Sequence, residues 1–120
     1  MKIRKFIAFA LLSLVIVSCS SSKKSGGSTT DTLVPGEKEL AAIQPKYVDV
    51  TMQKLNDGYA VYSGPCTKCH NAKKLYKRTD EEWQKSIARM APKAKISEAQ
   101  KDALTKYVFA MRAARPDQIR

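Results

Sequence analysis

Residues 66–70, with the sequence Cys-Thr-Lys-Cys-His, constrain this 120-residue chain more than any other feature. Two thiols separated by two residues and followed directly by an imidazole form the attachment signature of c-type haem. A zinc site needs four ligands, but beyond this motif the chain offers no second histidine and only Cys19, which lies at the end of the signal-like segment described below. A thioredoxin-like dithiol needs strands alternating with helices, a pattern that this sequence lacks. The motif therefore predicts one haem per chain, bonded to Cys66 and Cys69 and ligated at its iron by His70.

The first 18 residues have the pattern of a secretory signal peptide. Three basic residues precede an apolar run over residues 6–17, which is too short to span a bilayer comfortably. The run ends at Ser18 and Cys19, as in a bacterial lipobox, where the signal is removed and the cysteine is acylated. The alternative is a plain signal peptide with a chance cysteine. We predict a lipoprotein anchored through Cys19 in a Gram-negative cell envelope, facing the periplasm, and Ser20 favours the outer membrane over the inner one.

Residues 20–32 are small, polar or charged and contain no apolar side chain, which is typical of a flexible tether. We assign residues 19–46 to the lipidated cysteine, this tether and a short connecting segment, and residues 47–115 to a single domain. No cysteine is left for a structural disulfide. Because a hydrophobic core of this size is marginal, we expect the bound haem to supply part of it.

The apolar periodicity predicts helices and no strands. A short helix over residues 37–43 is stopped by Pro45, and three core helices follow: from about residue 50 to 63, from Thr79 to 91–92, and from Ser97 to a point before Pro116. Their apolar stripes are Met52, Leu55, Tyr59 and Tyr62; Trp83, Ile87 and Met90; and Leu104, Tyr107, Val108 and Met111. We predict an all-α fold with three core helices around a covalently bound haem.

Two further spacings resemble those of the class I cytochromes c. Gly58 and Tyr62 precede the first haem cysteine by eight and four residues, and Leu104 and Tyr107 lie three residues apart in the last predicted helix. A glycine lets two helices approach closely and an aromatic ring fills their crossing. The resemblance covers about residues 50–112 and implies a cytochrome c-like fold. The chain departs from the family in its short separation of His70 from Met90 and in lacking a proline soon after the motif.

The resemblance also implies a methionine thioether as the second axial ligand, since no second histidine exists. Met90 is favoured because it is predicted at a helix end beside a proline, whereas Met52 and Met111 lie on apolar stripes. An open distal site is the alternative. Candidates for the haem pocket are Tyr62, Trp83 and Tyr107; Trp83 could line it, donate to a haem propionate, or be an ordinary core residue.

Removal of residues 1–18 leaves 19 basic and 11 acidic residues, a formal charge of +8. Such a surface would steer an acidic redox partner, but it could also be merely solvated or rest on anionic lipid. We predict a one-electron carrier and not an enzyme, with no nucleic-acid partner because the protein is exported. The alternatives are a peroxidase or small-molecule reductase with an open distal site, and a gas or redox sensor. Nine basic residues lie within 68–95: Lys68, Lys73, Lys74, Lys77, Arg78, Lys85, Arg89, Lys93 and Lys95.

Overall fold

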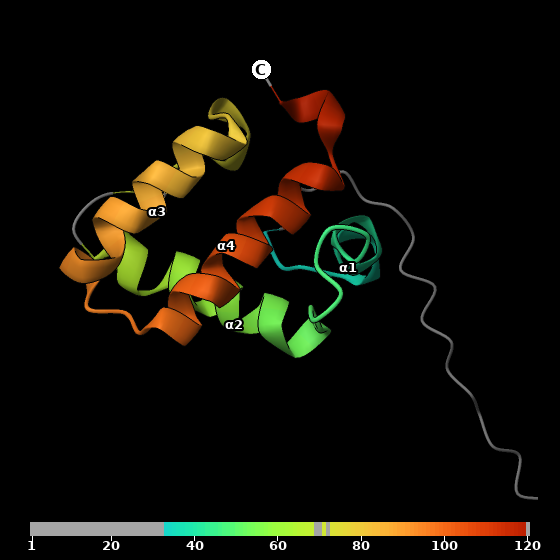
Figure 1. Ribbon diagram of the computed structural model, residues 1–120. Coiled ribbons are helices and arrows are strands. Elements are labelled where there is room, and N and C mark those ends of the chain that lie inside the picture. Colours follow the sequence, from blue (N-terminus) through green and yellow to red (C-terminus); the bar gives the residue numbers. More distant parts are fainter. Residues whose placement is uncertain (1–32, 69–70, 72, 120) are drawn as a thin grey trace, which may run out of the picture.

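The computed structural model describes residues 33–68, 71 and 73–119, and this part of the chain is helical without a strand (Figure 1). The all-α prediction is confirmed. The predicted signal peptide, Cys19, Cys69 and His70 lie outside the described residues. No helix of the described ranges is long and apolar enough to cross a membrane. The elements are α1 (Glu37–Ile43), α2 (Met52–Ser63), η1 (Pro65–Thr67), η2 (Leu75–Lys77), α3 (Asp80–Ala94), α4 (Glu98–Ala113) and η3 (Pro116–Gln118), where η denotes a 3-10 helix.

Two of the helix starts follow directly from the sequence. The Thr79 hydroxyl accepts from the Glu82 backbone N–H, while the Thr79 N–H donates to the Glu82 carboxylate at 2.8 Å. Ser97 and Gln100 make the same reciprocal pair of bonds at the start of α4. Such capping boxes satisfy two backbone donors that a helix start leaves unpaired. Both predicted helix starts are confirmed.

The end of α3 differs from the expectation. The helix does not stop at residues 91–92 but continues to Ala94, with Pro92 inside its last turn. A proline removes one intrahelical hydrogen bond without forbidding the turn that follows it. The helix ends at Lys95, which adopts a left-handed conformation with φ of 54°, while the Ile96 N–H donates to the Ala91 carbonyl. Met90 therefore lies within α3 and not at its end. The expectation that Met90 ends a helix, which was one reason to favour it as the iron ligand, was wrong.

Helices α2 and α4 cross in close contact at Gly58 (Figure 1). A Cβ added to Gly58 would lie 2.2 Å from the Ala103 carbonyl oxygen and 2.5 Å from the Tyr107 Cβ. The Tyr107 ring fills the crossing, with its centroid 5.8 Å from that of Tyr59 and 5.5 Å from that of Tyr62. The predicted packing of Gly58 and Tyr62 against the last helix is confirmed.

A fourth helix, α1, covers the side of α4 that α2 and α3 leave open (Figure 1). Ile43 of α1 is buried in the same core as Tyr107, and the Glu39 carboxylate lies 3.3 Å from the Arg115 guanidinium. We expected three core helices and assigned this segment to a connection. Its apolar residues instead pack on α4, where residues 106–112 are all buried.

A cluster of charges joins the turn before α2 to α4. The Lys106 ammonium, on a side chain only 7% exposed, lies 2.6 Å from the Asp49 carboxylate and 2.9 Å from that of Asp102. Lys54 contacts the same two carboxylates at 3.1 and 3.2 Å. Hydrogen bonds from Lys106 and then Lys54 lower the pKa of Asp49 to about 2. Burial alone lowers the pKa of Lys106, but its bonds to Asp49 and Asp102 raise that pKa overall, so Lys106 stays charged.

Candidate haem site

A cavity of about 360 Å³ opens between α2, η1, α3 and α4, in the size range of about 300 to 1,000 Å³ that is usual for cofactor sites. The crossing of α2 with α4 fixes one side, and α3 leans over it to form the other. Apolar side chains supply most of the wall, which favours an apolar ligand. They include Pro65, Trp83, Ile87, Met90, Ala91, Ala94, Ile96 and Leu104.

Cys66 and Met90 line this cavity together, although 24 residues separate them in the sequence. Cys66 is held by η1, where the Thr67 hydroxyl donates to the carbonyls of Ser63 and Gly64, each at 2.9 Å. Burial raises the pKa of the Cys66 thiol, so it is protonated at neutral pH. The structure thus brings together two of the four residues predicted to bind haem, and Cys69 and His70 lie outside the described residues.

Met90 is the one methionine of the described residues that lines the cavity. Met111 is fully buried in the core, and Met52 is partly exposed at the first position of α2. The thioether of Met90 is partly buried on the face of α3 that also carries Trp83 and Ile87. The location of Met90 on the cavity wall therefore replaces the helix-end argument that first singled it out.

The three aromatic residues predicted for the haem pocket have different positions. Tyr62 lines the cavity, and its hydroxyl donates to the Lys73 carbonyl. Trp83 also lines it, but its indole N–H donates to the buried Leu75 carbonyl at 3.0 Å, so that donor is engaged within the protein and not aimed at a ligand carboxylate. Tyr107 is absent from the described cavity wall: its hydroxyl donates to the Leu33 carbonyl at 2.7 Å, and burial raises its pKa well above the usual value.

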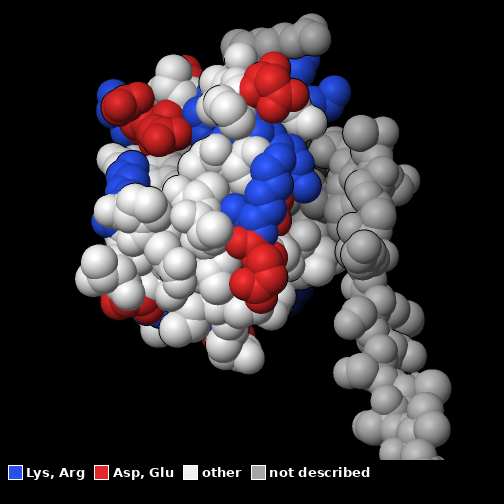
Figure 2. Space-filling model, turned by 90° about the vertical axis from the view of Figure 1, so that its right-hand side faces the viewer, with Lys and Arg blue, Asp and Glu red and all other residues white. Residues whose placement is uncertain are grey.

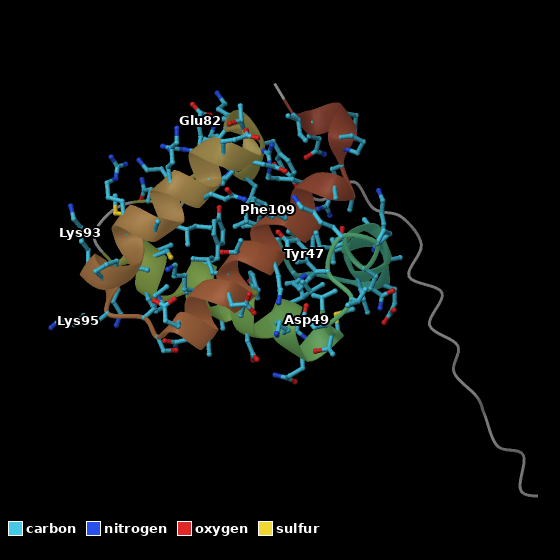
Figure 3. The ribbon with its side chains drawn as sticks, viewed as in Figure 1. Tyr47, Asp49, Glu82, Lys93, Lys95 and Phe109 are labelled. Atoms are coloured by element: carbon cyan, nitrogen blue, oxygen red, sulfur yellow. The ribbon has the colours of Figure 1, made fainter. Side chains whose placement is uncertain are left out.

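Basic side chains form the polar part of the cavity wall. Lys73, Arg78, Arg89 and Lys93 all line it, and Arg78 and Arg89 also line an adjoining groove of about 270 Å³. Figure 3 shows Lys93 and Lys95 projecting outward at one end of α3, far from Asp49 at the other end of the molecule. By contrast, the face on the α1 side mixes basic and acidic side chains among uncharged ones (Figure 2). Five of the nine basic residues of 68–95 thus line the cavity or the adjoining groove: Lys73, Arg78, Lys85, Arg89 and Lys93.

The described residues fit a haem by the chemistry of their side chains. A macrocycle with an apolar body and two carboxylates matches an apolar cavity with guanidinium and ammonium groups at its edge. A thiol and a thioether that line the same cavity match its covalent attachment and its iron. Within the described ranges, no group of three or more His, Cys, Asp or Glu side chains could hold a separate metal ion.

Two arrangements near the site escaped the sequence reasoning. Arg112 is buried and donates to Asp80 at 2.8 Å and to the Leu75 carbonyl at 2.9 Å, and Lys106 is buried against Asp49. Both pairings join residues more than 30 positions apart in the sequence. Helical periodicity predicts contacts only within one helix, so it could not reveal them.

The fold and the site together define a small all-α protein with an apolar, cysteine-bearing cavity edged by basic groups. No protein-family model, curated protein sequence or solved structure matches this chain.

Proposed function

We propose that this protein is a membrane-tethered electron carrier of the cytochrome c type. In this proposal Cys66 and Cys69 would hold one haem through thioether bonds, and His70 and Met90 would ligate its iron. The observation that carries the proposal is that Cys66 and Met90 line one apolar cavity, as the motif and a distal thioether require. When bound, the haem supplies a one-electron couple, and a methionine ligand raises its potential relative to a second histidine.

The side chains of the cavity have separate tasks in this proposal. Trp83, Ile87 and Leu104 exclude water from the cofactor, which keeps the local dielectric constant low. Arg78 and Arg89 neutralise anionic groups at the edge of the cavity. An electron carrier needs no substrate to enter, so these side chains could keep the cavity closed during transfer.

A haem enzyme is the alternative, either a peroxidase or a small-molecule reductase. Such an enzyme needs an acid or base beside an open distal position. The described residues of the cavity wall include no carboxylate, and Met90 lines the same cavity, which favours a thioether ligand over an open distal position. We therefore place the carrier first. A gas sensor, in which Met90 leaves the iron when a ligand binds, is the third alternative.

One experiment separates these functions. The protein is produced in a bacterium that attaches haem c, and its absorption spectrum is recorded oxidised, reduced, and reduced with carbon monoxide. A low-spin spectrum unchanged by carbon monoxide supports the carrier, whereas ready binding of carbon monoxide supports an enzyme or a sensor. Mass spectrometry of acid-denatured protein tests the attachment: loss of the haem from the chain would overturn the proposal.

The proposed partner is a redox protein with an acidic docking surface, which the basic side chains around the cavity attract. The lipid on Cys19 keeps the protein at the membrane of a Gram-negative envelope, on the periplasmic side. The described residues begin at Leu33, whose carbonyl accepts a hydrogen bond from the Tyr107 hydroxyl.

A further inference from the structure

The segment 73–78 forms part of the cavity wall but contains little regular structure. Lys73 and Arg78, at its two ends, both line the cavity, and Leu75 between them is buried in the core. Within the segment, the short helix η2 is closed by a long backbone hydrogen bond of 3.4 Å from the Lys77 N–H to the Lys74 carbonyl. Its position therefore depends strongly on bonds from other parts of the protein.

Side chains of three different helices supply those bonds. Tyr62 of α2 donates its hydroxyl to the Lys73 carbonyl. Trp83 of α3 and Arg112 of α4 both donate to the Leu75 carbonyl, at 3.0 and 2.9 Å, and both bonds are buried. A bond from a guanidinium is charge-assisted and stronger than one between neutral groups.

The charge of Arg112 is itself balanced inside the protein. Its Nε donates to the Asp80 carboxylate at 2.8 Å, and Asp80 is the first residue of α3. A buried cation without such a partner would be costly. The pair therefore lets Arg112 hold the Leu75 carbonyl and the start of α3 at once.

We infer that Tyr62, Trp83 and Arg112 are positioning residues that hold the segment 73–78 as a fixed wall of the haem cavity. This inference rests on the proposed function. In an electron carrier, a wall that keeps one position in both oxidation states limits the rearrangement that accompanies transfer. The three donors do not touch the iron; they act through the two backbone carbonyls that they bind.

The test compares two substitutions that each remove one buried tyrosine hydroxyl. Tyr62→Phe removes the bond to Lys73, and Tyr107→Phe removes the bond to Leu33, which lies away from the cavity wall. Amide hydrogen exchange of residues 73–78 and the reduction potential are measured on the full-length haem-bearing protein. Loss of one hydrogen bond, at about 0.5 to 1.5 kcal/mol, corresponds to about two- to tenfold faster exchange.

We expect Tyr62→Phe to accelerate exchange in 73–78 and to shift the potential, while Tyr107→Phe lowers overall stability and leaves both unchanged. Trp83→Phe should act like Tyr62→Phe, because it keeps a ring and removes the indole donor. Equal effects of Tyr62→Phe and Tyr107→Phe on exchange and potential would overturn the inference. If the protein carries no covalent haem, the proposed function is overturned, and so is any effect of the segment on a reduction potential. The hydrogen-exchange rates of residues 73–78 would still show whether the side-chain donors hold this segment in place.

Discussion

Gly58 of α2 faces Tyr107 of α4 so closely that a Cβ on Gly58 would lie 2.5 Å from the Tyr107 Cβ. The backbone of α4 is closer still, with the Ala103 carbonyl oxygen at 2.2 Å. No side chain larger than hydrogen fits there unless the two helices separate. This contact sets the distance between α2 and α4, and both helices contribute to the wall of the cavity.

We therefore expect Gly58→Ala to destabilise the protein. Replacing a helical glycine with alanine gains up to about 1 kcal/mol in helix propensity, but overpacking of a core contact costs about 1 to 3 kcal/mol. Because the clash is with backbone, we expect the cost to prevail and the free energy of unfolding to fall, as measured by urea titration. Gly36→Ala is the control, since its Cβ would lie 3.5 Å from the Glu39 carboxylate, in ordinary contact. A stability of Gly58→Ala equal to or above that of the unchanged protein would contradict the close contact.

Acid should weaken the charge cluster around Lys106. The pKa of Asp49 is lowered from 3.8 to about 2 in the folded protein, so its contribution to stability is complete above about pH 4. That contribution is lost as the pH falls from about 4 toward 2, because the unfolded chain binds the proton first. Unfolding midpoints measured between pH 2 and pH 6 should fall less steeply in Asp49→Asn than in the unchanged protein. Parallel pH profiles for the two proteins would show that Asp49 does not contribute.

The sequence predicted the helices well because its signals for them are local. The capping boxes at Thr79 and Ser97 lie within four residues, and Gly58 and Tyr62 share one helix face with fixed spacing. We expected α3 to end at Pro92, but the helix continues to Ala94. It ends there because Lys95, the next residue, adopts a left-handed conformation.

The cavity could be predicted from the sequence only in part. Cys66 and Met90 were chosen from a motif and a ligand preference, and both line the cavity. A bond from its indole N–H to a haem propionate was one of three roles weighed for Trp83; Trp83 does line the cavity, but that donor binds the Leu75 carbonyl. Hydrogen bonds to backbone carbonyls cannot be predicted from the sequence, because every residue carries the same backbone acceptor. The packing of α1 was missed for a related reason, since seven residues show too little periodicity to reveal a buried face.

Met90→Ala tests the distal ligand. Loss of the thioether should give high-spin iron that binds carbon monoxide readily and has a lower reduction potential. Met111→Leu is the matched control, because Met111 is fully buried in the core and does not line the cavity. That change nearly conserves volume and should cost less than about 1.5 kcal/mol without altering the spectrum. A low-spin spectrum that survives in Met90→Ala and is lost in Met111→Leu would transfer the role to Met111.

Cys19→Ala tests the membrane anchor. Without an acyl chain, haem-bearing protein should move from the membrane fraction to the soluble periplasmic fraction, because the lipid is what supplies the membrane affinity. Fractionation with immunoblotting and metabolic labelling with a radioactive fatty acid would measure this. Label retained by the Cys19→Ala protein would show that acylation occurs elsewhere or that the cysteine has another role.

The basic surface near the cavity should govern the rate of electron transfer to anionic partners. Lys73, Lys74 and Lys77 are exposed, and Lys73 also lines the cavity, so their charges lie beside the expected path of the electron. The attraction should be long-ranged at low salt, because the Debye length falls from about 30 Å at 0.01 M to about 8 Å at 0.15 M ionic strength. Hexacyanoferrate(III) as the anionic oxidant and tris(phenanthroline)cobalt(III) as the cationic one separate this effect from the intrinsic reactivity of the haem.

We expect oxidation of the reduced protein by hexacyanoferrate(III) to slow as salt is added, and oxidation by tris(phenanthroline)cobalt(III) to accelerate. Reversing Lys73, Lys74 and Lys77 to glutamate should slow the anionic reaction at low salt by about tenfold, because steering by a charged surface changes association rates by about 10 to 1,000-fold. The spectrum and the potential should change little, since all three side chains are exposed. A comparison of two single variants, Lys74→Glu and Lys38→Glu, controls for net charge, because Lys38 is an exposed lysine of α1. If both single reversals slow the reaction equally, the attraction comes from the overall positive charge and not from this surface.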